Sequence, residues 1–344
     1  MEKKKNKGLK VFLIILITFI VISLIITGIV LWFINNKLDK IDYIELPPEE
    51  ITVNEGVEEN ETLDDYRTIA ILGIDARNDT FTGSRSDCII LVTINNKNKE
   101  VKLTSVYRDT YLDIDGYGLD KVTHAYAYGN AKLSINTLNK NLDLNIKDFI
   151  TINFDSVVTM VDAVGGVELS ITDEELKYIN GYINEINRVT NNNAENINTS
   201  GPHNLNGVQA LAYGRIRYTD GGDYKRTERM RYVLTEVFNK TKKKNIFELN
   251  NILDIMLPHI STNIDRNEVL DLIPKITSYN VIYSAGWPYS TKGITLDRWY
   301  GVPVTLEDNV VQLHQEVFGE TDYTVSETVK EISNRIVSKT DYTE

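Results

Sequence analysis

The chain has 344 residues, of which 42% are hydrophobic, which is enough for a large core in one or two domains. Its formal net charge is −12, and the first ten residues hold five lysines and one glutamate, so the remainder carries −16. A body with this charge repels DNA and shows no nucleic-acid-binding signature, so we expect no nucleic acid partner. A single cysteine, Cys88, excludes an intramolecular disulfide.

Residues 11–33 form an apolar run without a single charge. At 1.5 Å per residue this run spans roughly 34 Å as a helix, enough to cross a hydrocarbon core of about 30 Å. A cleaved signal peptide is the alternative, but residues 34–37 offer no small-residue cleavage site. The lysines of residues 1–10 predict that this tail is cytoplasmic. We therefore expect a single-pass protein of the cell membrane, with everything after Phe33 outside the cytoplasm.

Residues 34–66 are predicted to be an acidic linker, because they are rich in glutamate and poor in large apolar residues. A catalytic domain is expected over residues 67–320, followed by a C-terminal tail over residues 321–344. Within the domain, apolar runs with strand character alternate with segments of helical spacing. The expected strands are residues 68–74, 88–94, 101–106, 149–154 and 167–171, and the expected helices are residues 130–141, 155–165, 205–213, 222 onward and 306–318. This alternation predicts an α/β fold, with a mixed sheet between helices and one transmembrane helix before it.

Arginine is concentrated in two short windows, residues 74–87 and 213–229, and recurs just after the third expected strand. The planar guanidinium group matches phosphate oxygens well, so such a cluster in an acidic protein predicts a phosphate or pyrophosphate ligand. Asp75 and Asp87 lie at the ends of neighbouring strands, where α/β sheets gather ligands. Mg²⁺ is usually held by one or two carboxylates together with substrate phosphates, so these two residues are candidate metal ligands. A surface ion pair is the alternative for any one Asp beside an Arg.

Seven ordered motifs then resemble a known family. They read ILGIDAR, RSDCIILVTIN, SVYRDT, KVTHAYAYG, VDAVGGV, LNGVQALAYGRIR and DYKRTER, and they cover roughly residues 67–232. This order is similar to that of the LytR-CpsA-Psr domain of Gram-positive cell envelopes. The resemblance implies a transferase that moves a glycopolymer, such as a teichoic acid or capsule chain, from a polyprenyl-pyrophosphate carrier to a peptidoglycan hydroxyl, forming a phosphodiester.

The resemblance also implies roles for individual residues. Asp75 and Asp87 would bind Mg²⁺, or Mn²⁺ in its place, and Asp223 would activate the acceptor hydroxyl, with Arg85 and Arg108 also catalytic. The pyrophosphate would be held by Arg85, Arg108, Arg215, Arg217, Arg226 and Arg229. On the apolar pattern alone, Ile152, Phe154, Val158 and Val161 are candidates for the lining of a lipid pocket.

Two residues depart from the family pattern: Met230 stands where a glutamine is usual, and Tyr107 where a proline is usual. Neither change touches the carboxylates. Two other functions remain open from the sequence. One is a membrane-tethered regulator or scaffold that binds polyprenyl phosphates without turnover, and the other is a carrier-lipid pyrophosphatase in which water replaces the sugar hydroxyl.

Overall fold

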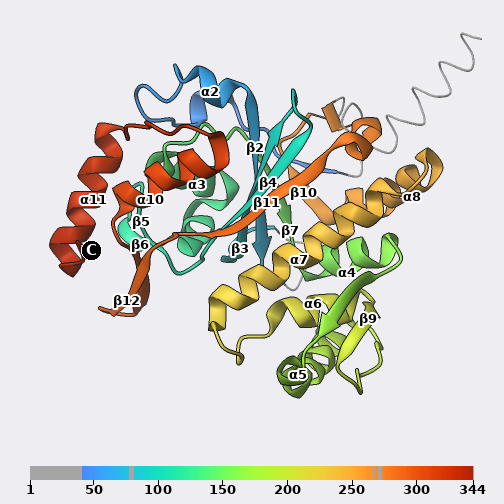
Figure 1. The fold of residues 1–344 in the computed structure, drawn as a ribbon. Helices are drawn as coiled ribbons and strands as arrows, with labels where there is room; N and C mark the ends of the chain where they lie inside the picture. The colour runs from blue at the N-terminus through green and yellow to red at the C-terminus, as the bar shows by residue number, and fades with distance from the viewer. Residues whose placement is uncertain (1–40, 77–80, 266–267, 270–272, 344) are drawn as a thin grey trace, which may run out of the picture. The chain divides into compact units, whose positions relative to one another are not determined.

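The computed structural model describes residues 41–343, apart from 77–80, 266–267 and 270–272 (Figure 1). Asp42–Glu344 form one compact unit. The expected transmembrane helix, residues 11–33, lies outside the described residues and stays a prediction. Within the part of the chain that is described, no helix combines the length and apolar character needed to cross a membrane.

A mixed sheet of seven strands forms the centre of the unit, in the order β1-β10-β7-β2-β3-β4-β11. The strands are β1 Asp42–Tyr43, β10 Ile260–Thr262, β7 Asp148–Ile152, β2 Tyr66–Ile74, β3 Ser86–Asn95, β4 Glu100–Val106 and β11 Asn280–Trp287. β2, β3 and β4 pair antiparallel, whereas β7 joins β2 and β11 joins β4 in parallel. The mixed sheet predicted from the sequence is thus confirmed.

Helices cover both faces of the sheet, which explains why its central strands are apolar almost throughout. Leu91 packs into one core cluster and its neighbour Val92 into another, because successive side chains of a strand point to opposite faces. The first face carries α3 Thr123–Leu142, α10 Leu306–Leu313 and α11 Glu327–Thr340. The second face carries α7 Gly222–Lys242, and beyond it pack α4 Phe154–Ala163, α5 Asp173–Thr190, α6 Gly207–Arg215 and α8 Ile246–Met256.

Three two-stranded sheets and several short helical turns complete the unit. The small sheets pair β5 Tyr111–Ile114 with β6 Gly118–Lys121, β8 Val167–Ile171 with β9 Gly201–Leu205, and β12 Thr291–Thr295 with β13 Trp299–Pro303. The short turns are η1 Pro48–Glu50, α2 Glu61–Asp64, η2 Leu257–His259, η3 Ile273–Ser278 and the π-turn η4 His314–Phe318. The β12–β13 hairpin matters below, because it reaches the functional site from far along the chain.

Two of the predicted boundaries are corrected by the packing. Within the expected linker, Val57 and Leu63 are buried in the core, and the Asn54 side chain donates a 2.6 Å hydrogen bond to Asp143. The expected tail contains α11, whose Val329 and Ile332 are buried in the same core. A few apolar residues at the right positions are enough to dock both segments, although their overall composition is polar. The domain therefore extends from residue 42 to the end of α11.

The start of α4 is also corrected. The sequence predicts this helix from residue 155, but the N-cap is Asn153, whose side chain accepts a hydrogen bond from the backbone N–H of Ser156. The hydroxyl oxygen of Ser156 in turn accepts a hydrogen bond from the backbone N–H of Asn153, so the two residues form a capping box. Asp155 lies in the first turn, where its charge favours the helix dipole.

Candidate active site

A bulge between β2 and β3 places the two predicted metal ligands at one end of the sheet. The register changes from Gly73 opposite Cys88 to Ile74 opposite Ser86, so Asp87 is the extra residue of β3. Bulges of this kind re-aim side chains next to active sites. A Cβ on Gly73 would lie 2.9 Å from the Cβ of Cys88, so only glycine permits this close pairing. Asp75 follows β2 directly, and both carboxylates reach the same cavity.

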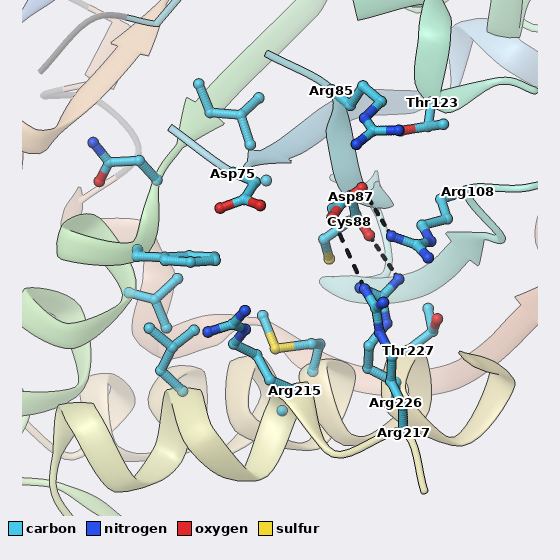
Figure 2. Close-up of a pocket in the computed structure, with 18 of the residues that line it drawn as sticks. Asp75, Arg85, Asp87, Cys88, Arg108, Thr123, Arg215, Arg217, Arg226 and Thr227 are labelled. Carbon is cyan, nitrogen blue, oxygen red and sulfur yellow. Dashed lines mark hydrogen bonds and ion pairs between the residues drawn. The ribbon is translucent and has the colours of Figure 1, made fainter. Parts of the chain in front are cut away.

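The cavity has a volume of ≈ 480 Å³ and opens where β2, β3 and β4 meet α3, α4, α6 and α7 (Figure 2). Its lining combines several arginines and aspartates with an apolar wall. The lining residues are Gly73, Ile74, Asp75, Arg85, Asp87, Cys88, Arg108, Asp109, Lys121, Thr123, His124, Ile152, Asn153, Phe154, Val157, Tyr182, Leu211, Gly214, Arg215, Arg217, Tyr218, Arg226, Thr227 and Met230. Five of the six predicted pyrophosphate ligands are therefore brought together, with both predicted metal ligands.

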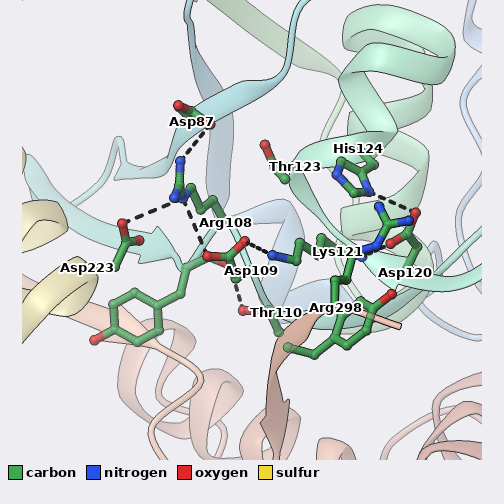
Figure 3. A network of polar contacts seen from close by, with 12 residues as sticks. Asp87, Arg108, Asp109, Thr110, Asp120, Lys121, Thr123, His124, Asp223 and Arg298 are labelled. Atoms are coloured by element: carbon green, nitrogen blue, oxygen red, sulfur yellow. Dashed lines mark hydrogen bonds and ion pairs between the residues drawn. The ribbon is translucent and has the colours of Figure 1, made fainter. Parts of the chain in front are cut away.

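Arg108 lies among three carboxylates (Figure 3). Its Nη1 is 3.0 Å from Oδ1 of Asp87, and its Nε is 3.5 Å from carboxylate oxygens of both Asp109 and Asp223. Although burial acts to lower it, Asp87 and Asp223 raise the pKa of Arg108. The guanidinium group is thus held in place before any ligand arrives, which is the condition for strong electrostatic stabilisation of an anion.

Arg226 and Arg217 both contact Asp87 and Asp223. Nη2 of Arg226 donates to the backbone oxygen of Asp87 at 2.9 Å, and its Nε lies 3.0 Å from Oδ1 of Asp223. Arg217 is held less closely, with its Nε 3.7 Å from the Asp223 carboxylate and its Nη2 3.9 Å from the Asp87 carboxylate. The Asp223 carboxylate is therefore shared by Arg108, Arg217 and Arg226, whereas the Asp87 carboxylate is shared by Arg108 and Arg217.

The positive charge at this end of the cavity affects the pKa of Arg217. Burial, and then the repulsion from Arg226 and Arg108, lower the pKa of Arg217. Arg85 adds a further guanidinium group to the wall and has no carboxylate partner among the described residues. An anion with several oxygens would relieve this repulsion, so the site is arranged for a phosphate or pyrophosphate group.

Arg215 lies apart from Arg217 and Arg226, towards the apolar wall (Figure 2). Its guanidinium carbon is 4.7 Å from the ring centroid of Phe154, and its Nη2 is 3.4 Å from Glu185. The chain is extended at Ile216, the C-cap of α6, but Arg215 and Arg217 do not reach the same ion-pair partners. Arg215 therefore stands at the boundary between the charged and the apolar parts of the cavity.

The apolar wall differs in part from the predicted lipid pocket. Ile152 and Phe154 line the cavity, but Val158 and Val161 are buried in the core beside α5 and α6. The face of α4 that meets the cavity holds Phe154 and Val157, three residues apart, as helical spacing requires. Val158 and Val161 are therefore withdrawn as lining residues, and Val157 and Leu211 take their place.

Arg229 was predicted to bind pyrophosphate and does not reach the cavity. It is only 3% exposed, and its Nε donates a 2.7 Å hydrogen bond to Glu175 of α5. Its other nitrogens donate to the backbone oxygen of Ile216 at 3.0 Å and to Thr219 at 2.7 Å. With its donors used in this way, Arg229 fixes the loop between α6 and α7 and so positions Arg217.

The carboxylates present are compatible with a divalent cation that takes the rest of its shell from phosphate and water. Asp75 is exposed, and within the described part of the chain its carboxylate has no hydrogen bond or ion pair. Asp87 reaches the same cavity, and no third His, Cys, Asp or Glu among the described residues completes a protein-only site. Mg²⁺ typically binds through one or two carboxylates plus substrate phosphates, so this donor set suits it.

The end of β6 and the start of α3 contribute residues that the sequence reasoning did not assign. Lys121, Thr123 and His124 line the cavity. Nζ of Lys121 is 2.7 Å from Asp109 (Figure 3), and the hydroxyl of Thr123 donates to the backbone of Ser86. The positive end of this helix therefore adds to the attraction for an anion. The motif KVTHAYAYG was the available signal, but it did not show which of its residues face the ligand.

The two departures from the family pattern have clear surroundings. Met230 lines the cavity and packs its sulfur against Gly214, where any Cβ would collide with it. Tyr107 lies across Gly286, and its ring meets that of Tyr224 edge-on, with centroids 4.4 Å apart. Met230 therefore fills space in the wall of the cavity, and Tyr107 fills space beside the start of α7.

Known proteins resemble this chain over most of its length. The model of the LytR_cpsA_psr family matches residues 35–303. The chain is 30% identical to the polyisoprenyl-teichoic acid–peptidoglycan teichoic acid transferase TagT of Bacillus subtilis (strain 168), over 85% of this chain and 91% of TagT. It is 32% identical to the transferase TagU of Enterococcus faecalis (strain ATCC 700802 / V583), over 79% of this chain and 83% of TagU.

Solved structures agree with the sequence relatives. TagT bound to LIIa-WTA matches with a TM-score of 0.60 and 28% identity, covering 75% of this chain and 92% of TagT. The family protein YwtF (TagT) with bound octaprenyl pyrophosphate lipid matches with a TM-score of 0.57 and 26% identity, covering 80% of this chain and 99% of YwtF. On this shared fold and sequence, the chain belongs to the LytR-CpsA-Psr family.

Proposed function

We propose that this protein transfers a glycopolymer from a polyprenyl-pyrophosphate carrier to a hydroxyl of peptidoglycan and forms a phosphodiester. The observation that carries the proposal is a single cavity with a surplus of guanidinium groups at one end and an apolar wall at the other. A pyrophosphate joined to a prenyl chain likewise has a charged end and an apolar end. The names of relatives support it, since TagT and TagU are polyisoprenyl-teichoic acid–peptidoglycan transferases.

In this proposal the arginines bind and orient the donor. Arg108, Arg217 and Arg226 contact the pyrophosphate oxygens, Arg85 closes the open side, and Arg215 lies where the pyrophosphate meets the lipid. Phe154 and Val157 contact the first isoprene units. Phosphoryl transfer depends mainly on positioning and on neutralising charge, and fixed guanidinium groups provide both.

Asp75 and Asp87 would hold Mg²⁺, or Mn²⁺. When bound, the metal neutralises charge on the phosphate oxygens. Asp87 also forms an ion pair with Arg108.

The acceptor hydroxyl gives its proton to Asp223 as its oxygen attacks the phosphorus that carries the glycan. One oxygen–phosphorus bond forms, the bond from that phosphorus to the bridging oxygen breaks, and polyprenyl phosphate leaves. Asp223 suits this role because it lies beside the arginines without lining the donor cavity itself. A carboxylate that faced the phosphates directly would repel the donor instead.

The test uses the full chain in detergent with lipid-linked glycan, nascent peptidoglycan and Mg²⁺, following covalent glycan and free phosphate separately. We expect covalent product, a loss of at least tenfold in transfer for Asp223→Ala with donor binding retained, and weaker binding and transfer for Arg217→Ala. Phosphate release without attachment of glycan would instead indicate a pyrophosphatase. Donor binding without either product would indicate a scaffold and would overturn the proposal.

We also propose that residues 11–33 anchor the protein in the cell membrane with residues 1–10 in the cytoplasm, so the active site faces the wall where its acceptor lies. External protease on intact protoplasts should remove the body and leave an anchored stub. Full protection of the body would contradict this orientation.

A further inference from the structure

A second cavity of ≈ 290 Å³ lies beside the donor cavity, and the two share Asp109. Its walls are formed by Tyr107 after β4, Tyr224 at the start of α7, and Trp299 and Gly301 of β13. Asp223 lines this cavity and not the first. The proposed base therefore faces the second cavity while the arginines that hold it face the donor.

The aromatic side chains of this cavity are held rigidly with parts of their surfaces open. Trp299 is 43% exposed, and its indole lies over the paired glycines 293 and 301 of the hairpin, where a Cβ on Gly293 would be 2.9 Å from Nε1. Tyr224 is 37% exposed, packs against Tyr107 and shares a hydrogen bond with Thr291. Two partly exposed aromatic rings that line one cavity form a contiguous apolar surface, and such surfaces mark ligand-binding grooves.

The chemistry of the lining indicates a sugar ring. One face of a pyranose presents C–H groups with partial positive charge, which the negative face of an aromatic ring attracts. The hydroxyls around the ring edge need polar partners, and Asp109 and Asp223 are among the residues that line this cavity. The volume is at the lower limit of ordinary ligand pockets, which suits one ring better than a longer group.

We propose that this second cavity binds one pyranose ring of the acceptor glycan and presents its hydroxyl to Asp223. The inference rests on the proposed transferase function and adds the place of the acceptor to it. In the step already given, the hydroxyl proton passes to Asp223, its oxygen forms the new bond to phosphorus, and polyprenyl phosphate leaves on the side of the donor cavity. The two substrates thus meet at the wall that Arg108 and Asp223 form.

Binding can be tested without turnover. Of the three tryptophans, Trp32 lies in the expected membrane anchor and Trp287 is fully buried, so sugar-dependent changes in fluorescence should come from Trp299. The probe is a soluble disaccharide of N-acetylglucosamine and N-acetylmuramic acid, added to the full chain in detergent. We expect the disaccharide to quench the fluorescence in a saturable manner, and we expect no such quenching in the Trp299→Phe variant. Tyr224→Ala should weaken the binding seen through Trp299 at least tenfold.

Kinetics separate acceptor binding from donor binding. Trp299→Ala and Tyr224→Ala should raise the KM for acceptor at least tenfold while the Kd for lipid-linked donor stays within twofold. Trp299→Tyr should restore most of the acceptor KM and so excludes a folding defect. The matched control is Tyr117→Ala, because Tyr117 is also an exposed aromatic residue, stacked on Tyr128 and outside both cavities.

The outcomes distinguish failure of the proposed acceptor site from failure of the proposed transferase function. Transfer by the unmutated protein with an unchanged acceptor KM in both alanine variants would overturn the acceptor site and leave the transferase intact. Quenching by the disaccharide without any transfer would support the sugar site while the proposed function fails. Absence of quenching together with an unchanged acceptor KM would overturn the inference.

Discussion

Nη1 of Arg108 lies 3.0 Å from Oδ1 of Asp87, so a proposed phosphate ligand and a proposed metal ligand are ion-pair partners. The pair holds both groups in position before substrate arrives, at the point where β3 begins and β4 ends. It also means that metal and phosphate affinities are coupled through one carboxylate.

Because of this coupling, Asp87→Asn should raise the affinity for pyrophosphate without metal but lower the affinity for the metal. Asp87→Asn should bind inorganic pyrophosphate more tightly without metal, because a negative charge beside the anion is removed. In the presence of Mn²⁺, Asp75→Asn and Asp87→Asn should each weaken metal binding at least tenfold, measured by electron paramagnetic resonance with pyrophosphate present. Asp322→Asn changes an exposed carboxylate at the far end of the chain and should leave both affinities unchanged. Unaltered Mn²⁺ affinity in both site variants would place the metal elsewhere.

We expect Arg217 to contribute to pyrophosphate binding but not to the stability of the free protein. Its pKa is lowered by burial and by the repulsion from Arg226 and Arg108, so Arg217→Ala should not lower the free energy of unfolding without ligand. Each charged hydrogen bond to phosphate contributes about 1.5–3 kcal/mol, so pyrophosphate affinity should fall roughly 10- to 100-fold. Calorimetry and urea unfolding measure the two effects. Arg188→Ala, on the exposed end of α5, serves as the control, and an equal loss of affinity there would argue against a specific contact.

Arg229 should behave as a structural residue. Arg229→Met leaves the buried carboxylate of Glu175 without its partner, and breaking a buried pair typically costs about 3–5 kcal/mol. Urea unfolding should show this loss, and adding Glu175→Gln should recover part of it, because the neutral amide no longer needs a cation. A variant that unfolds normally but loses pyrophosphate binding would show that Arg229 is a ligand after all.

Cys88 provides a pH-dependent measure of packing at the site. Burial raises the pKa of this thiol from 9.0 to about 11, so the folded protein retains the proton at pH values where the unfolded chain releases it. The stability that this group contributes is therefore present below pH 9 and lost as the pH rises towards about 11. Since the chain has one cysteine, alkylation by iodoacetamide followed by mass spectrometry reports it directly. Because Cys88 lines the cavity and is partly exposed, folded protein should react at pH 8 but more slowly than denatured protein, and equal rates would contradict the raised pKa.

The sequence by itself determined four of the seven strands of the central sheet (β2, β3, β4 and β7), the arginines and aspartates near their ends, and the family, whereas β1, β10 and β11 were not predicted. These follow from local patterns: apolar runs predict strands, and charged residues just beyond them predict ligands at the sheet edge. The acidic composition of residues 34–66 predicted a linker, but composition does not show where a few residues such as Val57 and Leu63 will dock.

Only the tertiary structure decided which residues of a correct pattern face the ligand. Arg226 and Arg229 are one helical turn apart on α7, yet Arg226 reaches Asp87 and Arg229 reaches Glu175. Helical spacing fixes their relative positions on the helix, whereas their partners come from β3 and α5, far away in the sequence. The second cavity depends even more on long-range packing, because Trp299 reaches Tyr107 and Asp223 only when the β12–β13 hairpin folds back onto the start of α7. A local sequence pattern does not predict that these residues line one cavity, because their proximity depends on how whole helices and strands pack around the core.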